Sequence, residues 1–302
     1  MTFTIETQIP KNTDVVFVAD LFVEDYRGGA ELTTEALISS APGLRVFKLH
    51  SVSLTPEIVE KNKHLTWVLC NWSMSPKEGL IALVTEGCKY VCVEYDYKYC
   101  KHRSSHLHEL QTKSPCDCHL TKNFPVGLYK RAQSVFFMSE GQKEEYELRF
   151  PHMKTWTNTQ VLSSVWKPED LDFILSLKKA PEVRTKKGTW AVLSGGSWIK
   201  NQKNTEDYCT SKSMPYELLG GLEYRTFLEH LSQYEGLVFH PLGFDTCPRL
   251  VVEASLLGLR LDLNENVQHR LEKWFKDVAA SVTMEYLRSR PSAFWNSTLQ
   301  KI

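Results

Sequence analysis

The stretch that decides the fold is GLVFHPLGFDTCPRLVVEASLLGLRLDLNEN, which spans Gly236–Asn266. Its apolar run at Leu237–His240 is typical of a buried strand, and a second such run follows at Leu259–Leu263. Between them, Pro248–Leu257 has the apolar spacing of a helix. A strand, a turn, a helix and a second strand in this order indicate a parallel α/β sheet.

The turn before that helix carries the residues with the most chemical interest. We place Pro248 in the first turn of the helix, where its missing N–H costs nothing, and Asp245 and Thr246 just before it as candidate caps. Glu253 follows Asp245 by eight positions on the same helix. A helix N-terminus beyond a strand end is a natural anion site. The alternative is a capped core helix with one solvated glutamate.

The same rhythm of strands and helices runs through the whole chain and predicts two α/β domains with a cleft between them. We place an N-terminal Rossmann-like domain at residues 1–165 and a C-terminal one at 166–302, with the linker near 163–188. The final helices, up to Pro291, are expected to cross back toward the first domain. A polar stretch at residues 97–124 interrupts the first domain. The predicted strands are Asp14–Leu21, Leu44–Leu49, Leu65–Cys70, Tyr90–Tyr95, Ser134–Met138, Thr159–Leu162, Thr189–Leu193, Leu237–His240 and Leu259–Leu263.

Composition narrows the class of protein. The chain has 302 residues, of which 42% are hydrophobic and 24% charged, as in soluble globular proteins. The longest apolar runs, such as Val15–Ala19, are far shorter than the ~20 residues of a transmembrane helix. No charged-then-apolar leader opens the sequence, so we expect a cytoplasmic protein. The 36 basic residues balance 36 acidic ones, which weakens a nucleic-acid-binding function.

The pair Asp245-x7-Glu253 resembles the Glu-x7-Glu signature of retaining glycosyltransferases of the GT-B fold, in particular glycosyltransferase family four. The turn Gly28-Gly29-Ala30-Glu31 is similar to the N-terminal glycine loop of that family. The phrase FDTCPRLVVEA and the later LDLNENVQH resemble small glycosyltransferases of bacteriophages and marine viruses, which suggests a viral source. The resemblance spans about residues 14–270. It implies two Rossmann-like domains that face each other across a cleft, with the glycine loop opposite the Asp245–Glu253 segment.

The resemblance also implies roles for single residues. Glu253 matches the carboxylate that holds the nucleotide ribose, and Asp245 matches the acid near the donor sugar, although it is one methylene shorter. Gly28 and Gly29 match the loop whose bare backbone approaches the donor diphosphate. Two further residues, Gly196 and Thr246, are candidates for donor contacts beside these.

The sequence departs from the family pattern at two places. The family's arginine after the first strand of the second domain is absent, so Lys200 and Lys203 are the candidates to neutralise the diphosphate, unless they only form a solvated basic loop. The family's histidine at the end of a strand of the first domain is also absent. At that place Tyr95 and Asp96 are the candidate catalytic contacts.

Residues 97–124 form an insertion rich in cysteine and histidine. Zinc prefers four thiolate and imidazole ligands, and Cys100, Cys116, Cys118 and His119 are our candidate set for a structural zinc. The alternative is free thiols and surface histidines, since Cys-x-Cys-His is not the usual Cys-x2-Cys spacing. A second alternative is that Arg103, His106 and His108 line the acceptor side of the cleft. GT-B chemistry requires no metal, so the ion would hold the insertion together.

The leading hypothesis is an enzyme that transfers a sugar from a nucleotide-diphosphate sugar to an acceptor, with retention of anomeric configuration. The acceptor can be a glycan, a small molecule or a modified base in phage DNA. The alternative class is a non-catalytic nucleotide- or carbohydrate-binding protein on the same fold, favoured by the missing histidine and arginine. A dinucleotide-dependent oxidoreductase is disfavoured because the first strand lacks Gly-x-Gly-x-x-Gly. The sequence identifies neither the donor base nor the oligomeric state.

Overall fold

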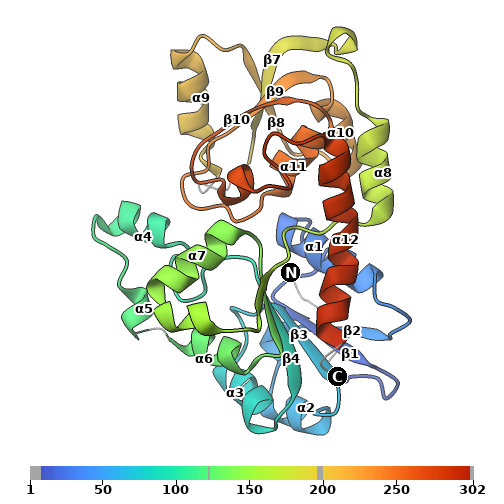
Figure 1. Cartoon of the computed structure of the whole chain (residues 1–302), viewed down its shortest axis with the longest axis vertical. Helices are drawn as coiled ribbons and strands as arrows, with labels where there is room; N and C mark the ends of the chain where they lie inside the picture. The colour runs from blue at the N-terminus through green and yellow to red at the C-terminus, as the bar shows by residue number, and fades with distance from the viewer. Residues whose placement is uncertain (1–7, 122, 196–199, 300–302) are drawn as a thin grey trace. The chain divides into compact units, whose positions relative to one another are not determined.

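The computed structural model describes residues 8–121, 123–195 and 200–299, and it divides into two compact units (Figure 1). The first unit comprises the described residues before Lys167 together with those from Leu287 onward. The second unit is Lys167–Tyr286. Both are built on parallel sheets, so the predicted α/β class with two Rossmann-like units is confirmed.

The first unit contains a six-stranded sheet in which every described strand pairing is parallel. Its strand order is β2-β1-β3-β4-β5-β6, so the chain winds outward in both directions from β1 and β3. All five residues of β1 are buried, as expected for a central strand covered on both faces. The strands are β1 (Val15–Ala19), β2 (Val46–His50), β3 (Thr66–Asn71), β4 (Lys89–Glu94), β5 (Ser134–Phe137) and β6 (Thr159–Val161).

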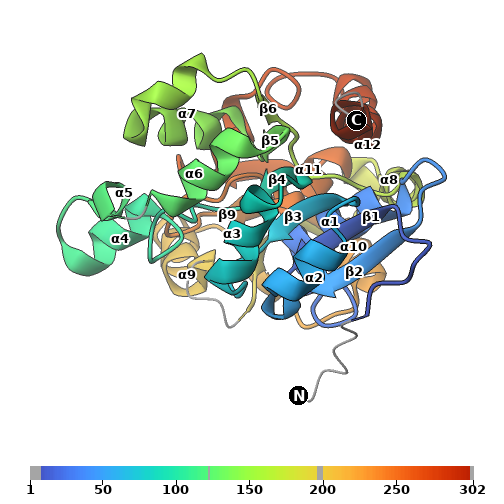
Figure 2. The ribbon, with the colours of Figure 1, turned by 90° about the horizontal axis from the view of Figure 1, so that it is seen from below.

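Helices cover both faces of this sheet. On one face α2 (Pro56–Lys61), α3 (Lys77–Thr85) and α6 (Phe124–Arg131) lie side by side (Figure 2). α7 lies on this face as well, since its Tyr146 contacts Tyr129 of α6 and Phe137 of β5. On the other face, the C-terminal half of α12 (Ala280–Leu299) packs against the strands, where the Phe294 ring contacts Phe136 and Phe17. The further helices of this unit are α1 (Gly29–Ser39), α4 (Ser105–Thr112), α5 (Cys118–Thr121), α7 (Glu140–Arg149), η1 (Ser51–Ser53) and η2 (Pro151–Thr155).

The prediction that the last helix ends at Pro291 is wrong. The helix α12 (Ala280–Leu299) continues past this proline. Proline removes one hydrogen bond from the helix, but the residues beyond it are anchored in the first unit. The ring of Phe294 lies 4.9 Å from that of Phe136, and the Trp295 indole N–H donates to the Leu37 carbonyl at 3.0 Å. Burial of these aromatic rings offsets the cost of the proline.

The second unit contains a four-stranded parallel sheet of order β10-β9-β7-β8. Its edge strand β8 and the helix α9 are absent from our predictions, because both carry mainly polar or half-exposed residues without clear periodicity. No helix among the described residues is long and apolar enough to cross a membrane. The elements are α8 (Pro168–Ser176), η3 (Pro181–Val183), β7 (Lys186–Leu193), α9 (Gln202–Ser211), β8 (Tyr216–Leu219), α10 (Tyr224–Leu231), β9 (Tyr234–Phe239), α11 (Arg249–Leu256), β10 (Arg260–Leu263) and η5 (Gln268–Leu271).

The stretch predicted as a linker, residues 163–188, is mostly part of the second unit. Arg184 is buried there, and its guanidinium donates to five backbone carbonyls. These carbonyls lie in three separate segments, so the arginine joins them as a cross-link would. Composition suggested a solvated connection, since the last part of this stretch, Ala180–Gly188, has two lysines, one arginine and little apolar content, but the pairing of Arg184 was not visible in the sequence.

Candidate functional site

The loops beyond the carboxyl ends of β7 and β9 hold three of the predicted site residues of the second unit, Lys200, Asp245 and Thr246. Asp245 lies in the loop after β9, where its backbone N–H donates to the Asn266 carbonyl at 2.8 Å. The side chain of Asn266 is buried and donates back to the carbonyls of Pro241 and Leu242. These bonds join the loop after β9 to the loop after β10, and they fix Asp245 at the ligand-binding edge of a parallel sheet.

Lys200 lies beside this carboxylate. Its ammonium is 2.5 Å from Asp245 Oδ2 and stands over the Phe239 ring, 5.4 Å from the centroid. The next residue, Asn201, donates from its side chain to the His240 carbonyl at 2.9 Å, which ties the segment after β7 to the end of β9. The sequence offered Lys200 and Lys203 equally as phosphate contacts. The structure brings only Lys200 to the acid.

Lys203 occupies a different environment. It lies on α9 and pairs with Asp207 one turn later, with 80% of its side chain exposed. Thr246 is buried in the loop directly after Asp245. The candidate Gly196 lies outside the described residues.

Glu253 is buried in the second unit and is not the solvated glutamate of the alternative interpretation. Its Oε1 accepts the Tyr224 hydroxyl proton at 2.7 Å and lies 3.5 Å from Arg249 Nε. Arg249 and Glu253 are one turn apart on α11, and both side chains are only 4% exposed. The carboxylate is therefore held in one orientation by two partners.

The helix that carries Glu253 begins later than we predicted. α11 starts at Arg249, so Pro248 is its N-cap and not a residue of its first turn. The N-cap position is taken by a proline, which forms no side-chain capping hydrogen bond, so neither Asp245 nor Thr246 is the N-cap residue. Because the bridge between Asp245 and Val267 holds that loop to the segment after β10, the aspartate is directed to Lys200 instead.

A second polar group at this edge was missed by sequence analysis. His240, which follows β9, lies 2.8 Å from Asp262 Oδ1 through its Nε2, and Tyr208 donates to the other oxygen of Asp262 at 3.0 Å. The rings of Tyr208 and His240 are 4.5 Å apart. A histidine directly after a buried strand was the available signal, but its partners come from α9 and β10.

The first unit presents its glycine loop at the N-terminus of α1. Gly28 is the N-cap of this helix, and a Cβ at that position would lie 2.5 Å from both Glu31 and Tyr26. The Glu31 carboxylate accepts from the backbone N–H groups of Gly28 and Glu31, which is half of a capping box. Burial raises the pKa of Glu31, and these N–H groups partly oppose the shift. The chain's own carboxylate therefore occupies the anion position predicted at Gly28 and Gly29.

The two predicted catalytic residues of the first unit follow β4. The Tyr95 hydroxyl lies 2.8 Å from Thr34 Oγ1, and burial raises the pKa of Tyr95 well above its usual value, so it remains protonated. Asp96 pairs with Arg103 and Lys98. Burial acts to raise the pKa of Asp96, but these two cations outweigh it and lower the pKa. Asp96 is therefore an ionised carboxylate that orients cations.

A buried network surrounds this pair. Glu94, at the end of β4, accepts from the Tyr129 hydroxyl and lies 3.2 Å from Lys98. The Gln142 amide donates to the carbonyls of Glu94 and Asp96. Arg103 also donates to the Asn71 side chain at the end of β3, at 2.8 Å. The sequence shows charged residues at alternate positions, Glu94, Asp96 and Lys98. It does not show that the side chains of Glu94 and Lys98 are buried.

The insertion brings four potential metal ligands together: Cys100, His108, Cys116 and Cys118. The histidine of this set is His108 and not the predicted His119, whose ring lies against Phe150. His108 is buried, so it does not line an acceptor surface either. Arg103 has 37% of its side chain exposed, so it is accessible to an acceptor.

Comparisons with known proteins agree with this architecture. No family model and no curated protein matches the sequence. The structure is similar to that of Anabaena Alr3699/HepE in complex with UDP and glucose, with a TM-score of 0.57 and 13% identity over 95% of this chain and 92% of that one. A complex of the same protein with UDP-glucose gives a TM-score of 0.56 at 12% identity over 94% and 92%.

An α-glucosyltransferase in complex with UDP and a 13-mer DNA containing an HMU base matches with a TM-score of 0.50. The identity is 11%, and the match covers 96% of this chain and 93% of that one. These structural neighbours are GT-B glycosyltransferases crystallised with UDP or UDP-sugar. The chain therefore has the GT-B glycosyltransferase fold.

Proposed function

We propose that the chain is a glycosyltransferase that moves a sugar from a nucleoside-diphosphate sugar to an acceptor hydroxyl, with retention of anomeric configuration. UDP is the first donor nucleotide to test, because the neighbouring structures hold it. The observation that carries the proposal is the Lys200–Asp245 ion pair at the carboxyl edge of the second sheet, with Glu253 fixed nearby on α11. This edge is where open parallel sheets bind ligands.

Each of these groups matches one part of the donor. Glu253, oriented by Arg249 and Tyr224, accepts hydrogen bonds from the ribose hydroxyls. Lys200 exchanges Asp245 for the diphosphate when the donor binds, since phosphate oxygens compete well for an ammonium group. Asp245 is then available to contact the transferred sugar. Gly28 and Gly29 contribute backbone N–H groups to the diphosphate once it displaces the Glu31 carboxylate from the Gly28 N–H.

The reaction breaks the bond between the anomeric carbon and the β-phosphate oxygen, and the acceptor oxygen forms the new bond to that carbon. The nucleoside diphosphate leaves with additional negative charge, and the acceptor hydroxyl releases one proton. Lys200 stabilises this developing charge. Asp96 holds Arg103 in place in the first unit, so Arg103 is our candidate for binding the acceptor.

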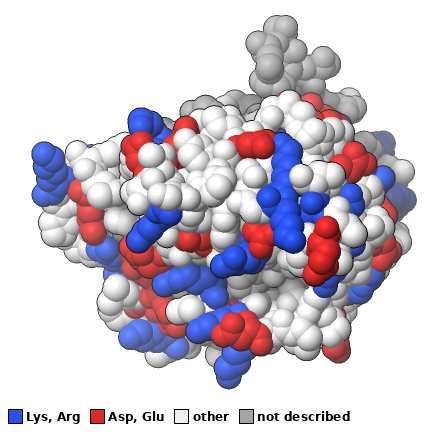
Figure 3. Space-filling model, turned by 90° about the horizontal axis from the view of Figure 1, so that it is seen from above, with Lys and Arg blue, Asp and Glu red and all other residues white. Residues whose placement is uncertain are grey.

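A glycan or small-molecule acceptor is favoured over DNA. Figure 3 shows one face of the molecule, and among its described residues the lysines and arginines are interspersed with aspartates and glutamates. DNA-binding surfaces gather basic residues on one face. The DNA complex of the neighbouring α-glucosyltransferase makes modified DNA the second candidate acceptor.

The test is calorimetric binding of UDP, together with hydrolysis of UDP-glucose, for the wild type, Glu253→Gln and Asp245→Asn. A hydrogen bond to a charged group is worth ~1.5–3 kcal/mol, so Glu253→Gln should weaken UDP binding roughly ten- to a hundred-fold. Asp245→Asn should lower turnover more than UDP affinity. Asp207→Asn, on the exposed face of α9, is the matched control. NMR of the transferred sugar determines the anomeric configuration.

The burial of Glu253 requires one further measurement. Gln cannot replace its ion pair with Arg249, so we expect Glu253→Gln to destabilise the fold as well, and unfolding must be measured beside binding. Tyr224→Phe removes the hydroxyl contact to Glu253 and should give a smaller loss of affinity. Equal UDP binding by all folded variants would contradict the proposed site. UDP binding without sugar transfer or hydrolysis would favour the non-catalytic alternative.

A further inference from the structure

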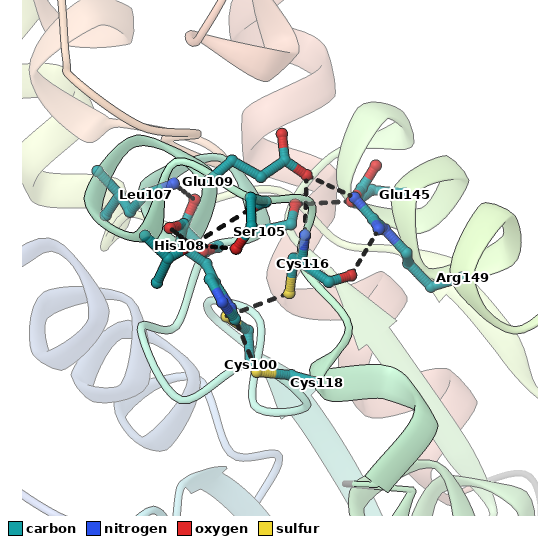
Figure 4. Close-up of polar contacts among 12 residues, drawn as sticks. Cys100, Ser105, Leu107, His108, Glu109, Cys116, Cys118, Glu145 and Arg149 are labelled. Carbon is teal, nitrogen blue, oxygen red and sulfur yellow. Dashed lines mark hydrogen bonds and ion pairs between the residues drawn. The ribbon is translucent and has the colours of Figure 1, made fainter.

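Four ligating side chains converge in the insertion of the first unit (Figure 4). Cys100 lies in the turn after β4, His108 on α4, Cys116 in the loop before α5 and Cys118 at the first position of α5. Their sulfur and nitrogen atoms all lie within 4.8 Å of one another, and all four residues are buried. The fold therefore places three thiol groups and one imidazole from three parts of the insertion close together.

Three of the distances between these atoms are close to those of a tetrahedral metal shell. Cys100 Sγ lies 3.7 Å from Cys116 Sγ and 3.7 Å from His108 Nδ1, and Cys118 Sγ lies 3.3 Å from the same nitrogen. A tetrahedral zinc with bonds of ~2.3 Å to sulfur and ~2.05 Å to nitrogen requires about 3.8 Å between sulfurs and about 3.5 Å between sulfur and nitrogen. A disulfide requires ~2.05 Å between sulfurs, and the three cysteines of the set are free thiols.

The chain around Cys116 is held by a network of charged side chains. The Cys116 N–H donates to Glu109 at 3.3 Å, and its carbonyl accepts from Arg149 at 3.0 Å. Arg149, on α7, also pairs with Glu109 and with Glu145, which accepts the Ser105 hydroxyl at 2.7 Å. Figure 4 shows this network beside the thiols. Such contacts orient ligands in metal sites and fix the loop that carries them.

The helices that carry His108 and Cys118 are short. α4 has eight residues and α5 has four, and helices this short are marginal in water without tertiary support. A bound metal supplies folding free energy to segments of this kind.

We propose that Cys100, His108, Cys116 and Cys118 bind a structural zinc ion through three thiolates and His108 Nδ1. The site joins the turn after β4 to α4 and α5, and through Arg149 to α7. It also holds the chain next to Arg103, three residues after Cys100. The zinc takes no part in sugar transfer.

The first experiment measures zinc in the purified full-length protein and tests its removal by a chelator. We expect about one zinc per chain, and a lower melting temperature after removal that recovers when zinc is added back. Cobalt should replace zinc and give the intense visible absorption of a tetrahedral site, together with thiolate-to-cobalt charge-transfer bands. The cobalt spectrum reports the ligand set independently of enzyme activity.

The second experiment compares the two histidines. His108→Asn should lower the affinity for cobalt and zinc at least tenfold and change the cobalt spectrum, whereas His119→Asn should change neither. Cys88→Ser, at a buried cysteine outside the cluster, is the control for loss of a thiol.

Three outcomes would overturn the proposal. The first is a folded wild type that holds no zinc, gives no tetrahedral cobalt spectrum and keeps its melting temperature with added metal or chelator. The second is a Cys100–Cys116 disulfide in place of metal binding. The third is an equal effect of the two histidine variants. If His108→Asn does not fold, the metal content and cobalt spectrum of the wild type decide the question.

Discussion

The carboxyl edges of the two sheets carry charged groups in different ways. In the first unit, Glu94 and Lys98 are fully or almost fully buried, with 0% and 3% of their side chains exposed. In the second, Lys200 is 36% exposed and Asp245 15%, and they form a single pair. Burying an ion requires strong compensation from its partners, whereas a partly exposed pair requires little. The first edge is therefore a fixed polar framework, and the second can exchange partners.

The two helix N-termini differ in the same sense. The first turn of α1 carries Glu31, whose carboxylate accepts from backbone N–H groups of that N-terminus, whereas the first turn of α11 carries no acidic residue. An anion attracted to helix N–H groups therefore meets a carboxylate in the first turn of α1 and none in the first turn of α11. This difference favours the second unit as the main binding site for the donor.

The largest effect is expected for Lys98→Met. It removes a partner of buried Glu94 and should cost about 3–5 kcal/mol of unfolding free energy when Glu94 is ionised. Burial raises the pKa of Glu94 from 4.5 to about 8, so the contribution of this one group to stability is fully present below pH 4.5 and is lost as the pH rises through the raised pKa. The loss caused by Lys98→Met should therefore be larger at pH 9 than at pH 5, as measured by chemical denaturation.

The matched control for this prediction is Lys63→Met. Lys63 pairs with Glu86 at 3.3 Å, but its side chain is 56% exposed. It should lose no more than ~1 kcal/mol. Similar losses for Lys98→Met and Lys63→Met would contradict the view that the first edge is a fixed framework.

An intermediate effect is expected for Lys200→Met. The fold should lose less than ~1 kcal/mol, because the pair is partly exposed. Affinity for UDP should fall roughly ten- to a hundred-fold, whereas binding of uridine should not change, since the lost contact is to phosphate. Lys203→Met, in the first turn of α9, should change UDP affinity less than twofold. Calorimetry with UDP and uridine measures all of these effects. An equal loss from both lysines would mean that the pairing with Asp245 does not select the phosphate ligand.

The smallest effect is expected for Glu31→Gln. Removing the carboxylate from the N-terminus of α1 changes the interaction with an anion by ~0.3–1 kcal/mol, so UDP affinity should rise about two- to five-fold. Because burial raises the pKa of Glu31, its charge develops only as the pH rises. The gain should therefore be greater at pH 8 than at pH 5, in parallel titrations with the wild type. A loss of affinity would show that the carboxylate helps to bind the donor.

Much of the fold was predictable because buried parallel strands leave dense apolar runs in the sequence. VVFVA at Val15–Ala19 is an example, and the strand–helix–strand unit around Asp245 and Glu253 is another. The edge strand β8 was not predictable, because half-exposed residues carry no such signal. Pro291 was misleading, because local propensity ends a helix there, while the burial of Phe294 and Trp295 continues it.

The sequence by itself determined the class of fold and which residue types are available at the strand ends: a glycine loop, an acid pair, two lysines and a group of cysteines. The tertiary structure alone decided which of them meet. It chose Lys200 over Lys203 for Asp245 and His108 over His119 for the cysteines. Spacing along the chain could not decide these choices, because the partners come from separate elements. Their distances depend on how the loops after different strands are joined, through contacts such as Asn266 to Pro241.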